Sequence, residues 1–324
     1  MSALRRDVRP MRVVSTFAGC GGSSLGYEMA GAEVVAAVEW DPHAAKCYRL
    51  NHPHTHVFDG DIAKATGEAI LNATGLDIGD LDILDGSPPC QGFSSAGKRV
   101  LDDPRNALFK QHMRLVRELQ PKHVVIENVS GMIKGKMRVV AGEIVASLKA
   151  EGYRVAAGLM EAQYFGVAQF RPRVFFIGSK IGQPSLPRPT SRPIPCRVAL
   201  ADVEPDEILI PKSAGQRLMA TNLQPGESGG DVLIRLGWKP GWFSVGMLHP
   251  DRCSPTIMKR DRGGTTLFHW TRRHVSIREA LVLTGFPPDY ILPGKFKDRW
   301  ARVGNSVAPP MSREICRMLE RLHA

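Results

Sequence analysis

Long apolar runs are missing from this chain of 324 residues. No stretch approaches the roughly 18 consecutive apolar residues that a membrane-spanning helix needs. The first ten residues are basic and lack the apolar region of a secretory signal peptide. We therefore expect a cytoplasmic protein, in a bacterial cytosol or nucleoid, with no membrane partner.

Cysteine is also scarce. Six cysteines are scattered along the chain, and no two of them have the Cys-x-x-Cys spacing of zinc or thioredoxin-like sites. Scattered cysteines in a chain of this length indicate reduced thiols rather than a disulfide framework. We expect no metal cofactor.

Acidic residues are outnumbered by basic ones, 32 to 43, which gives a formal charge of +11 and a pI near 9.6. A basic excess of this kind favours a polyanionic partner, above all nucleic acid. The alternative is a basic protein with no such partner, and charge alone leaves it open.

Strand-like apolar runs alternate with helical patterns through the first 180 residues. This βαβ alternation predicts an α/β fold with a mostly parallel sheet and helices on both faces. There are no internal repeats. The expected strands are 12–17, 33–38, 55–58, 81–84, 123–127, 153–160 and 173–178, and the expected helices are 23–30, one beginning at 41–42, 106–119, 139–150, 277–283 and 311–322.

The alternation stops near residue 180, where five prolines fall between positions 184 and 195. Proline clusters of this kind mark linkers or irregular structure. The segment 184–275 is rich in Gly, Pro, Arg and Trp and shows short possible strands but no clear helical period. We expect a first domain over 1–183, a smaller irregular domain over 184–275, and a return to the first domain over 276–324.

Cys90 follows a buried-strand pattern and two prolines and leads into a loop of small residues. Pro88 and Pro89 fix their own φ angles and favour extended geometry before them. The thiol is therefore expected at the edge of a sheet, where it could act as a nucleophile. The alternative is an ordinary cysteine that packs as a small hydrophobe.

A glycine-rich turn, Phe17 to Gly22, joins the first strand to the first helix, and such turns approach ligands closely. Ser24 replaces the third glycine of a dinucleotide fingerprint. Glu39 ends the second strand, where an acid binds ribose hydroxyls, and Trp40 could stack on adenine. Asp61, at the end of the third strand, could accept from the adenine amino group. These features suggest S-adenosylmethionine, with an ordinary glycine turn as the alternative.

Polar residues follow later strands as well. Glu127 ends the fifth strand, at the sheet edge expected for Cys90. Arg171 and Arg173, two positions apart, would share a face of an extended chain and suit a phosphate or carbonyl. Asn305 and Ser306 precede the last helix. The alternative for Glu127 is a solvated loop acid, and the alternative for the two arginines is a solvated basic edge. Asn305 and Ser306 could instead cap the last helix.

Seven of these segments occur in the order seen in the DNA (cytosine-5) methyltransferases of bacterial or phage type, which the chain resembles over about residues 11–180 and 254–320. Ser15 stands where many members carry an acid, and 184–253 lies where the family keeps its target-recognition region. The segments are Phe17-Ala18-Gly19-Cys20-Gly21-Gly22, Glu39-Trp40, Asp61-Ile62, Pro88-Pro89-Cys90-Gln91, Glu127-Asn128-Val129, Gln169-x-Arg171-x-Arg173 and Gly304-Asn305-Ser306-Val307.

The resemblance implies a Rossmann-like fold and methyl transfer from S-adenosylmethionine to C5 of cytosine in a specific double-stranded DNA sequence. It implies that Cys90 attacks C6 of a flipped-out base. Glu127 would contact N3 and the exocyclic amine, Arg171 the base carbonyl or the nucleophile loop, and Arg173 would support it. A cognate restriction endonuclease acting separately and a monomeric state are further expectations.

Two further groups of residues follow from the resemblance and the basic loops. The cofactor-binding group is Phe17, Ala18, Gly19, Gly21, Gly22, Glu39, Trp40, Asp61, Ile62, Pro88, Leu108, Asn305, Ser306 and Val307. The DNA-binding group is Gln91, Ser94, Lys98, Arg99, Arg260 and Arg262.

Three alternatives stay open. Relatives that methylate tRNA carry a Cys-Phe-Thr tripeptide, and no cysteine here is followed by Phe-Thr. A non-catalytic nucleic-acid-binding module would be expected to lose Cys90 or Glu127, and both are present. A nicotinamide oxidoreductase would be expected to keep a glycine at Ser24.

Overall fold

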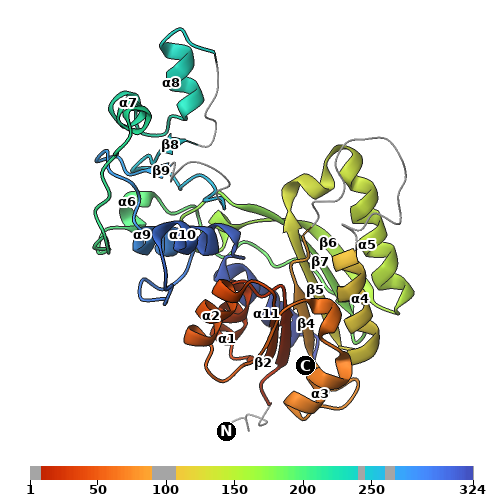
Figure 1. Cartoon of the computed structure of the whole chain (residues 1–324). Helices are drawn as coiled ribbons and strands as arrows, with labels where there is room; N and C mark the ends of the chain where they lie inside the picture. Colours follow the sequence, from red (N-terminus) through yellow and green to blue (C-terminus); the bar gives the residue numbers. More distant parts are fainter. Residues whose placement is uncertain (1–8, 90–106, 240–244, 260–266, 324) are drawn as a thin grey trace, which may run out of the picture. The chain divides into compact units, whose positions relative to one another are not determined.

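A computed structural model describes residues 9–89, 107–239, 245–259 and 267–323 of the chain (Figure 1). The chain forms two compact units. The first comprises Met1–Met160, Pro172–Pro187 and Met311–Ala324, and the second comprises Glu161–Arg171 and Arg188–Pro310.

The first unit is built on a seven-stranded sheet with the strand order β3-β2-β1-β4-β5-β7-β6. Strands β1 to β5 pair in parallel, whereas β7 runs antiparallel to β5. The mostly parallel sheet is therefore confirmed. The strands are β1 (Arg12–Thr16), β2 (Glu33–Glu39), β3 (His56–Asp59), β4 (Ile83–Gly86), β5 (His123–Val129), β6 (Arg154–Glu161) and β7 (Pro172–Ser179).

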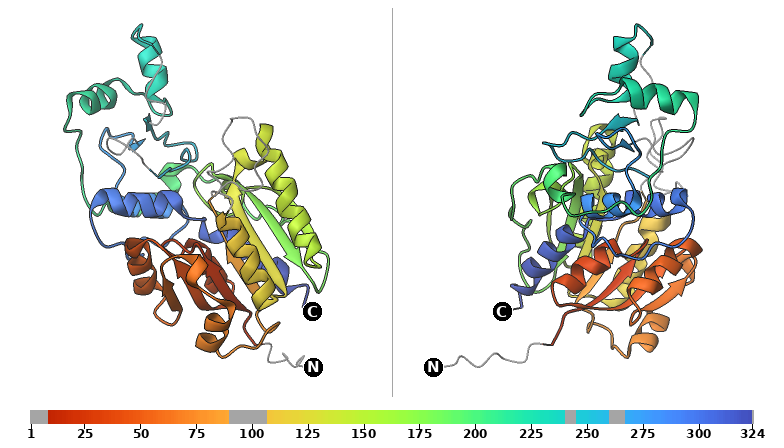
Figure 2. Two further views of the ribbon diagram at one scale, coloured as in Figure 1. Left: turned by 45° about the vertical axis from the view of Figure 1, so that its right-hand side comes forward. Right: turned by 90° about the vertical axis from the view of Figure 1, so that its left-hand side faces the viewer.

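Helices cover both faces of this sheet, as Figure 2 shows. Apolar side chains of α3, α4 and α5 form the main core with one face, and Tyr48 of α2 packs with Ala37 of β2 on the other. The α/β fold with helices on both faces is thus confirmed. The helices of this unit are α1 (Gly22–Met29), α2 (Pro42–Asn51), α3 (Gly67–Thr74), α4 (Ala107–Leu119), α5 (Arg138–Ala150) and most of α11 (Pro309–Glu320).

Local sequence explains where these helices begin and end. Asp41 caps α2 by accepting hydrogen bonds from the main-chain N–H groups of His43 and Ala44, and Pro42 occupies the first turn. Gly31, just past α1, has a φ of 88°, the left-handed geometry that glycine tolerates.

The second unit contains more helix than the sequence suggested. We expected no clear helix between 184 and 275, and this was wrong. Serine capping boxes begin α7 and α8, but each helix is so short that its apolar period is hard to detect. The elements are α6 (Cys196–Ala199), α7 (Ala214–Asn222), α8 (Gly229–Arg235), β8 (Gly246–Met247), β9 (Leu267–Phe268), α9 (Ile277–Leu283) and α10 (Phe296–Asn305).

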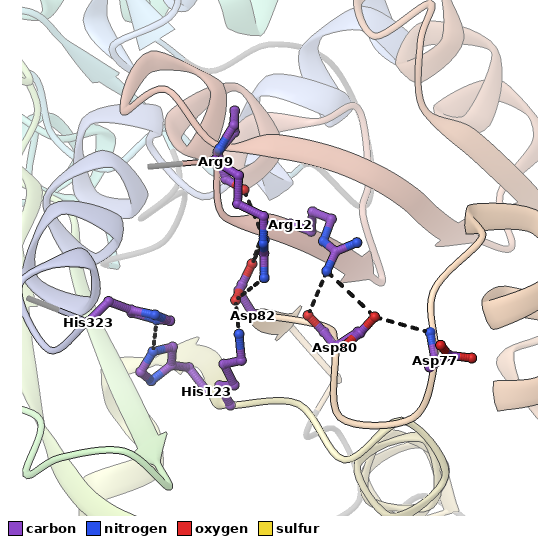
Figure 3. A network of polar contacts seen from close by, with 9 residues as sticks. Arg9, Arg12, Asp77, Asp80, Asp82, His123 and His323 are labelled. Atoms are coloured by element: carbon purple, nitrogen blue, oxygen red, sulfur yellow. Dashed lines mark hydrogen bonds and ion pairs between the residues drawn. The ribbon is translucent and has the colours of Figure 1, made fainter. Parts of the chain in front are cut away.

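A polar network lies at the amino ends of the central strands (Figure 3). The buried carboxylate of Asp82 accepts hydrogen bonds from Arg9 at 2.6 Å, from Lys122 at 2.7 Å and from the Arg12 main-chain N–H at 2.8 Å. Although burial acts in the opposite direction, these contacts lower the pKa of Asp82 to about 2. The charged form of this carboxylate therefore stabilises the fold.

Replacing Asp82 by Asn should lower the free energy of unfolding at pH 7 by about 2 kcal/mol, because a pKa depressed by nearly two units stores that much stability. The contribution is present above the unfolded pKa near 4 and is lost as the pH falls through about 2. Urea unfolding followed by circular dichroism at several pH values would measure it. A difference between variant and wild type that does not shrink below pH 4 would contradict the assignment.

Candidate active site at the carboxyl ends of the central strands

The glycine-rich turn after β1 has the open backbone expected of a ligand-binding loop. Phe17, Gly19 and Gly21 have positive φ angles of 53°, 59° and 97°. No atom lies within 4 Å of the position that a Gly19 side chain would occupy, and the described residues leave that space open. The positive φ of Phe17, a non-glycine residue, marks local strain of the kind found at binding sites.

The carboxylate of Glu39 secures this turn from the neighbouring strand. It accepts a hydrogen bond from Gly19 N–H at 2.7 Å and another from Asp41 N–H at 2.8 Å. Glu39 is buried, whereas the adjacent Trp40 is 74% exposed. An exposed indole beside a buried carboxylate can stack on an aromatic ligand.

Asp61 lies beyond the end of its strand rather than on it, because β3 ends at Asp59. Its carboxylate accepts from Ala63 N–H at 2.9 Å and caps the 3-10 helix η1 (Ile62–Lys64). Ile62 is buried against the main core. The expectation that Asp61 ends the third strand was therefore wrong by two residues.

Strand β4 leads toward Cys90, which itself lies outside the described residues. At Gly86 the backbone passes so close to β1 and α4 that an added Cβ would meet Thr16 Oγ1 at 2.4 Å and His112 Nδ1 at 2.8 Å. The Pro88 carbonyl accepts a hydrogen bond from the Asn128 side chain at 2.9 Å. The approach to Cys90 is thus held by β1, α4 and β5.

Glu127 and Arg173 form an ion pair at the same edge of the sheet. Arg173 Nε lies 3.0 Å from Glu127 Oε1, and the two side chains are only 12% and 10% exposed. Burial lowers the pKa of Arg173, and the charge of Glu127 opposes that shift. Because β7 is antiparallel to β5, its first residues reach the edge where β5 ends.

Arg171 is placed differently from Arg173. Strand β7 begins at Pro172, so Arg171 precedes the strand and belongs to the second unit. Its side chain is almost completely buried and donates to the carbonyls of Ile257, Gly304 and Ser306 at 2.8, 2.9 and 2.6 Å.

The remaining cofactor candidates divide between the two units. Leu108, on α4, packs against the main core of the first unit. Asn305 is the last residue of α10 in the second unit, and Ser306 follows it at the C-cap, where its hydroxyl donates to the Arg302 carbonyl at 2.7 Å. The sequence alternative was a cap of the last helix, but Ser306 ends the preceding helix α10, and α11 begins only at Pro309.

Two findings bear on other ligands. Among the described residues, no group of three or more His, Cys, Asp or Glu side chains is placed to hold a metal ion. In the same parts of the chain, no helix is long and apolar enough to cross a membrane.

The six DNA-binding candidates, Gln91, Ser94, Lys98, Arg99, Arg260 and Arg262, all fall outside the described residues.

A model of the C-5 cytosine-specific DNA methylases matches residues 11–321, nearly the whole chain. The chain belongs to this family. It is a DNA (cytosine-5) methyltransferase, as its ordered motifs predicted. Members of the family use S-adenosylmethionine.

Similar proteins of known name support the assignment of this methyltransferase to the family. The type II methyltransferase M.AquIA of Picosynechococcus is 42% identical over 192 residues, which cover 56% of this chain and 77% of the relative. M.NgoPII of Neisseria gonorrhoeae is 29% identical, with 96% of each chain covered. A prophage-encoded E. coli protein described as a DNA modification methyltransferase has the same fold, with a TM-score of 0.74, 24% identity and coverage of 97% and 99%.

Sequence reasoning missed one group at this site. Asp85, the penultimate residue of β4 and five positions before Cys90 in the sequence, is buried with Ser15, Ser23 and Tyr27 around it. The available signal was an acid within an apolar strand pattern, since buried charges are rare without a partner or a purpose.

Replacing Gly86 by Ala should destabilise the methyltransferase by about 1–3 kcal/mol, because the new methyl group would overlap Thr16 and His112. Gly142→Ala, in α5, is the matched control: nothing described lies within 4 Å of its added methyl group, and alanine favours a helix. Thermal unfolding of both variants measures the difference. Equal melting temperatures would contradict the close approach at Gly86.

Proposed function

We propose that this methyltransferase transfers a methyl group from S-adenosylmethionine to C5 of cytosine within a specific double-stranded DNA sequence. The observation that carries the proposal is the buried pair of Glu127 and Arg173, at the sheet edge where β4 also ends, four residues before Cys90 in the sequence. A carboxylate held by an arginine suits contact with a pyrimidine ring, and the thiol of Cys90 suits addition to that ring.

The cofactor would be held by residues at the ends of β1, β2 and β3. The open turn at Gly19, the buried Glu39 and the exposed Trp40 fit a nucleoside with ribose hydroxyls and an aromatic base. When bound, S-adenosylmethionine supplies an electrophilic methyl group. The other members of this proposed group are Phe17, Ala18, Gly21, Gly22, Asp61, Ile62, Pro88, Leu108, Asn305, Ser306 and Val307.

The protein's own chemistry begins at Cys90. As a thiolate, it adds to C6 of cytosine, and the ring becomes an enamine whose C5 is nucleophilic. After methyl transfer, C5 loses its proton to a base, and elimination expels the Cys90 thiolate. Attack at C6 requires a base that has left the helical stack, which costs a few kcal/mol.

Glu127 would contact N3 and the exocyclic amine as electron density moves onto N3. Arg173 is the residue that orients this carboxylate, through its Nε contact. Arg171 already directs both terminal nitrogens at protein acceptors, so its part is to hold the segment around Gly304 and Ser306. This division of the two arginines refines what the resemblance implied.

The DNA contacts and the cellular setting rest on sequence. Gln91, Ser94, Lys98, Arg99, Arg260 and Arg262 are the proposed DNA-binding residues, and 184–275 is the proposed target-recognition domain between the catalytic segments 1–183 and 276–324. Because the named relatives are type II methyltransferases, we propose a restriction-modification role with a separate endonuclease partner. A monomeric, cytoplasmic enzyme completes the proposal.

Replacing Cys90 by Ala should abolish methyl transfer while cofactor binding persists, because only the nucleophile is removed. Methyl incorporation from labelled S-adenosylmethionine into host DNA measures the activity, and Cys253→Ala is the matched control that should stay near wild type. With DNA carrying 5-fluorocytosine, the wild type should form a complex that survives a denaturing gel. Activity of the Ala variant near the wild-type rate would refute the role of Cys90.

Replacing Glu127 by Gln should lower kcat by about 100-fold or more, the usual cost of removing an acid–base group, and change DNA affinity by less than about threefold. Glu143→Gln on α5 removes a carboxylate elsewhere in the first unit and should leave both quantities unchanged. Single-turnover kinetics and a gel-shift titration separate the two effects. A loss confined to DNA binding would count against a catalytic part for Glu127.

A further inference from the structure

The carboxylate of Asp85 is a buried charge that the proposed chemistry does not use. Its residue is 3% exposed, and its hydrogen-bond donors among the described residues are three hydroxyl groups. Ser23 donates at 2.7 Å, Tyr27 at 3.0 Å and Ser15 at 3.2 Å. Burial raises the pKa of Asp85 to about 6. A carboxylate kept in such surroundings costs stability, so a gain in function is the more economical explanation.

The three hydroxyl donors come from the elements on either side of the glycine-rich turn Phe17 to Gly22, which we call the cofactor turn. Ser15 is on β1, which enters the turn, and Ser23 and Tyr27 lie one helical turn apart on α1, which leaves it. Asp85 itself is on β4, five positions before Cys90. One carboxylate therefore joins the cofactor turn to the strand that leads to the nucleophile.

A second contact extends this connection beyond the Cys90 segment. The main-chain carbonyl of Asp85 accepts a hydrogen bond from the hydroxyl of Thr16 at 3.1 Å, and this Thr16 hydroxyl oxygen lies 2.9 Å from His112 Nδ1. His112 is on α4, the helix that follows residues 90–106, and burial lowers its pKa to about 4, which keeps the imidazole neutral. The chain before and after Cys90 is thus anchored to β1 near one point.

We propose that Asp85 is a positioning residue that fixes the cofactor turn and α1 against β4, so that the methyl donor is held in register with the end of that strand. This inference rests on the proposed cofactor site. Small displacements of reacting groups cost large factors in rate, so a rigid connection between the two sites has a direct catalytic value. Asp85 acts through Ser23 and β4 and does not touch the substrate.

The pairing of β1 with β4 offers an exchange experiment. Ser15 and Asp85 are direct partners in the parallel register, with 3.2 Å between Ser15 Oγ and Asp85 Oδ2. Asp85→Ser leaves the hydroxyls of Ser23 and Tyr27 without their acceptor. Ser15→Asp places a second carboxylate beside the first. The double variant Ser15→Asp/Asp85→Ser returns a single carboxylate to the same pair of strands.

Titration calorimetry with S-adenosylhomocysteine should show that Asp85→Ser raises Kd about tenfold or more, a change of about 1.4 kcal/mol. The double variant should recover to within about threefold of wild type, and kcat should follow the same order. If Asp85→Ser does not fold, Asp85→Asn, which keeps the shape and one acceptor oxygen, should raise Kd about threefold. Wild-type Kd in the folded Asp85 variants would overturn the proposal.

Asp82→Asn is the matched control, because Asp82 is also a buried acid beside β4 but belongs to the network at the opposite edge (Figure 3). It should lower the melting temperature without changing Kd for S-adenosylhomocysteine. An equal rise in Kd for both variants would show a purely structural role and would refute positioning by Asp85. Failure of the wild type to bind S-adenosylhomocysteine would instead refute the proposed cofactor site.

Discussion

The pairing of β1 with β4 at the centre of the sheet is the constraint on which the rest of the site depends. The strand order runs outward from this pair in both directions, through β2 and β3 on one side and β5 on the other. At such a switch point the loops that follow neighbouring strands turn toward opposite faces and leave a crevice. The glycine turn follows β1, and in the sequence Cys90 comes four residues after β4 ends, so this pairing sets the proposed cofactor turn beside the end of the strand that precedes the proposed nucleophile.

Two buried acids associated with β4 show how differently the two edges of the sheet treat a charge. Asp82, at the amino edge, is surrounded by Arg9, Lys122 and a main-chain N–H, and its pKa is held near 2. Asp85, three residues later and nearer the active edge, has hydroxyl donors, and its pKa is raised to about 6. The first arrangement favours stability, and the second gives up stability beside the candidate site.

The two arginines of one short motif are likewise divided between tasks. Arg173, on β7, pairs with Glu127 in the first unit, whereas Arg171 bonds to carbonyls of the second unit from a position just before the strand. Gln169 extends the second arrangement by donating to Thr284 at 3.1 Å. A segment of five residues therefore contributes to the candidate site and to the internal order of the second unit.

The sequence by itself determined the alternation of strands and helices, the family and the candidate site residues, because periodicity, caps and short motifs are local properties of the chain. Only the tertiary structure decided which of these residues meet. The Glu127–Arg173 pair depends on an antiparallel neighbour 46 positions away, and the hydroxyl cage of Asp85 on a strand pairing across 70 positions. The short helices of the second unit were also visible only in the tertiary structure. A helix of two turns has too few residues to show a clear apolar repeat in the sequence.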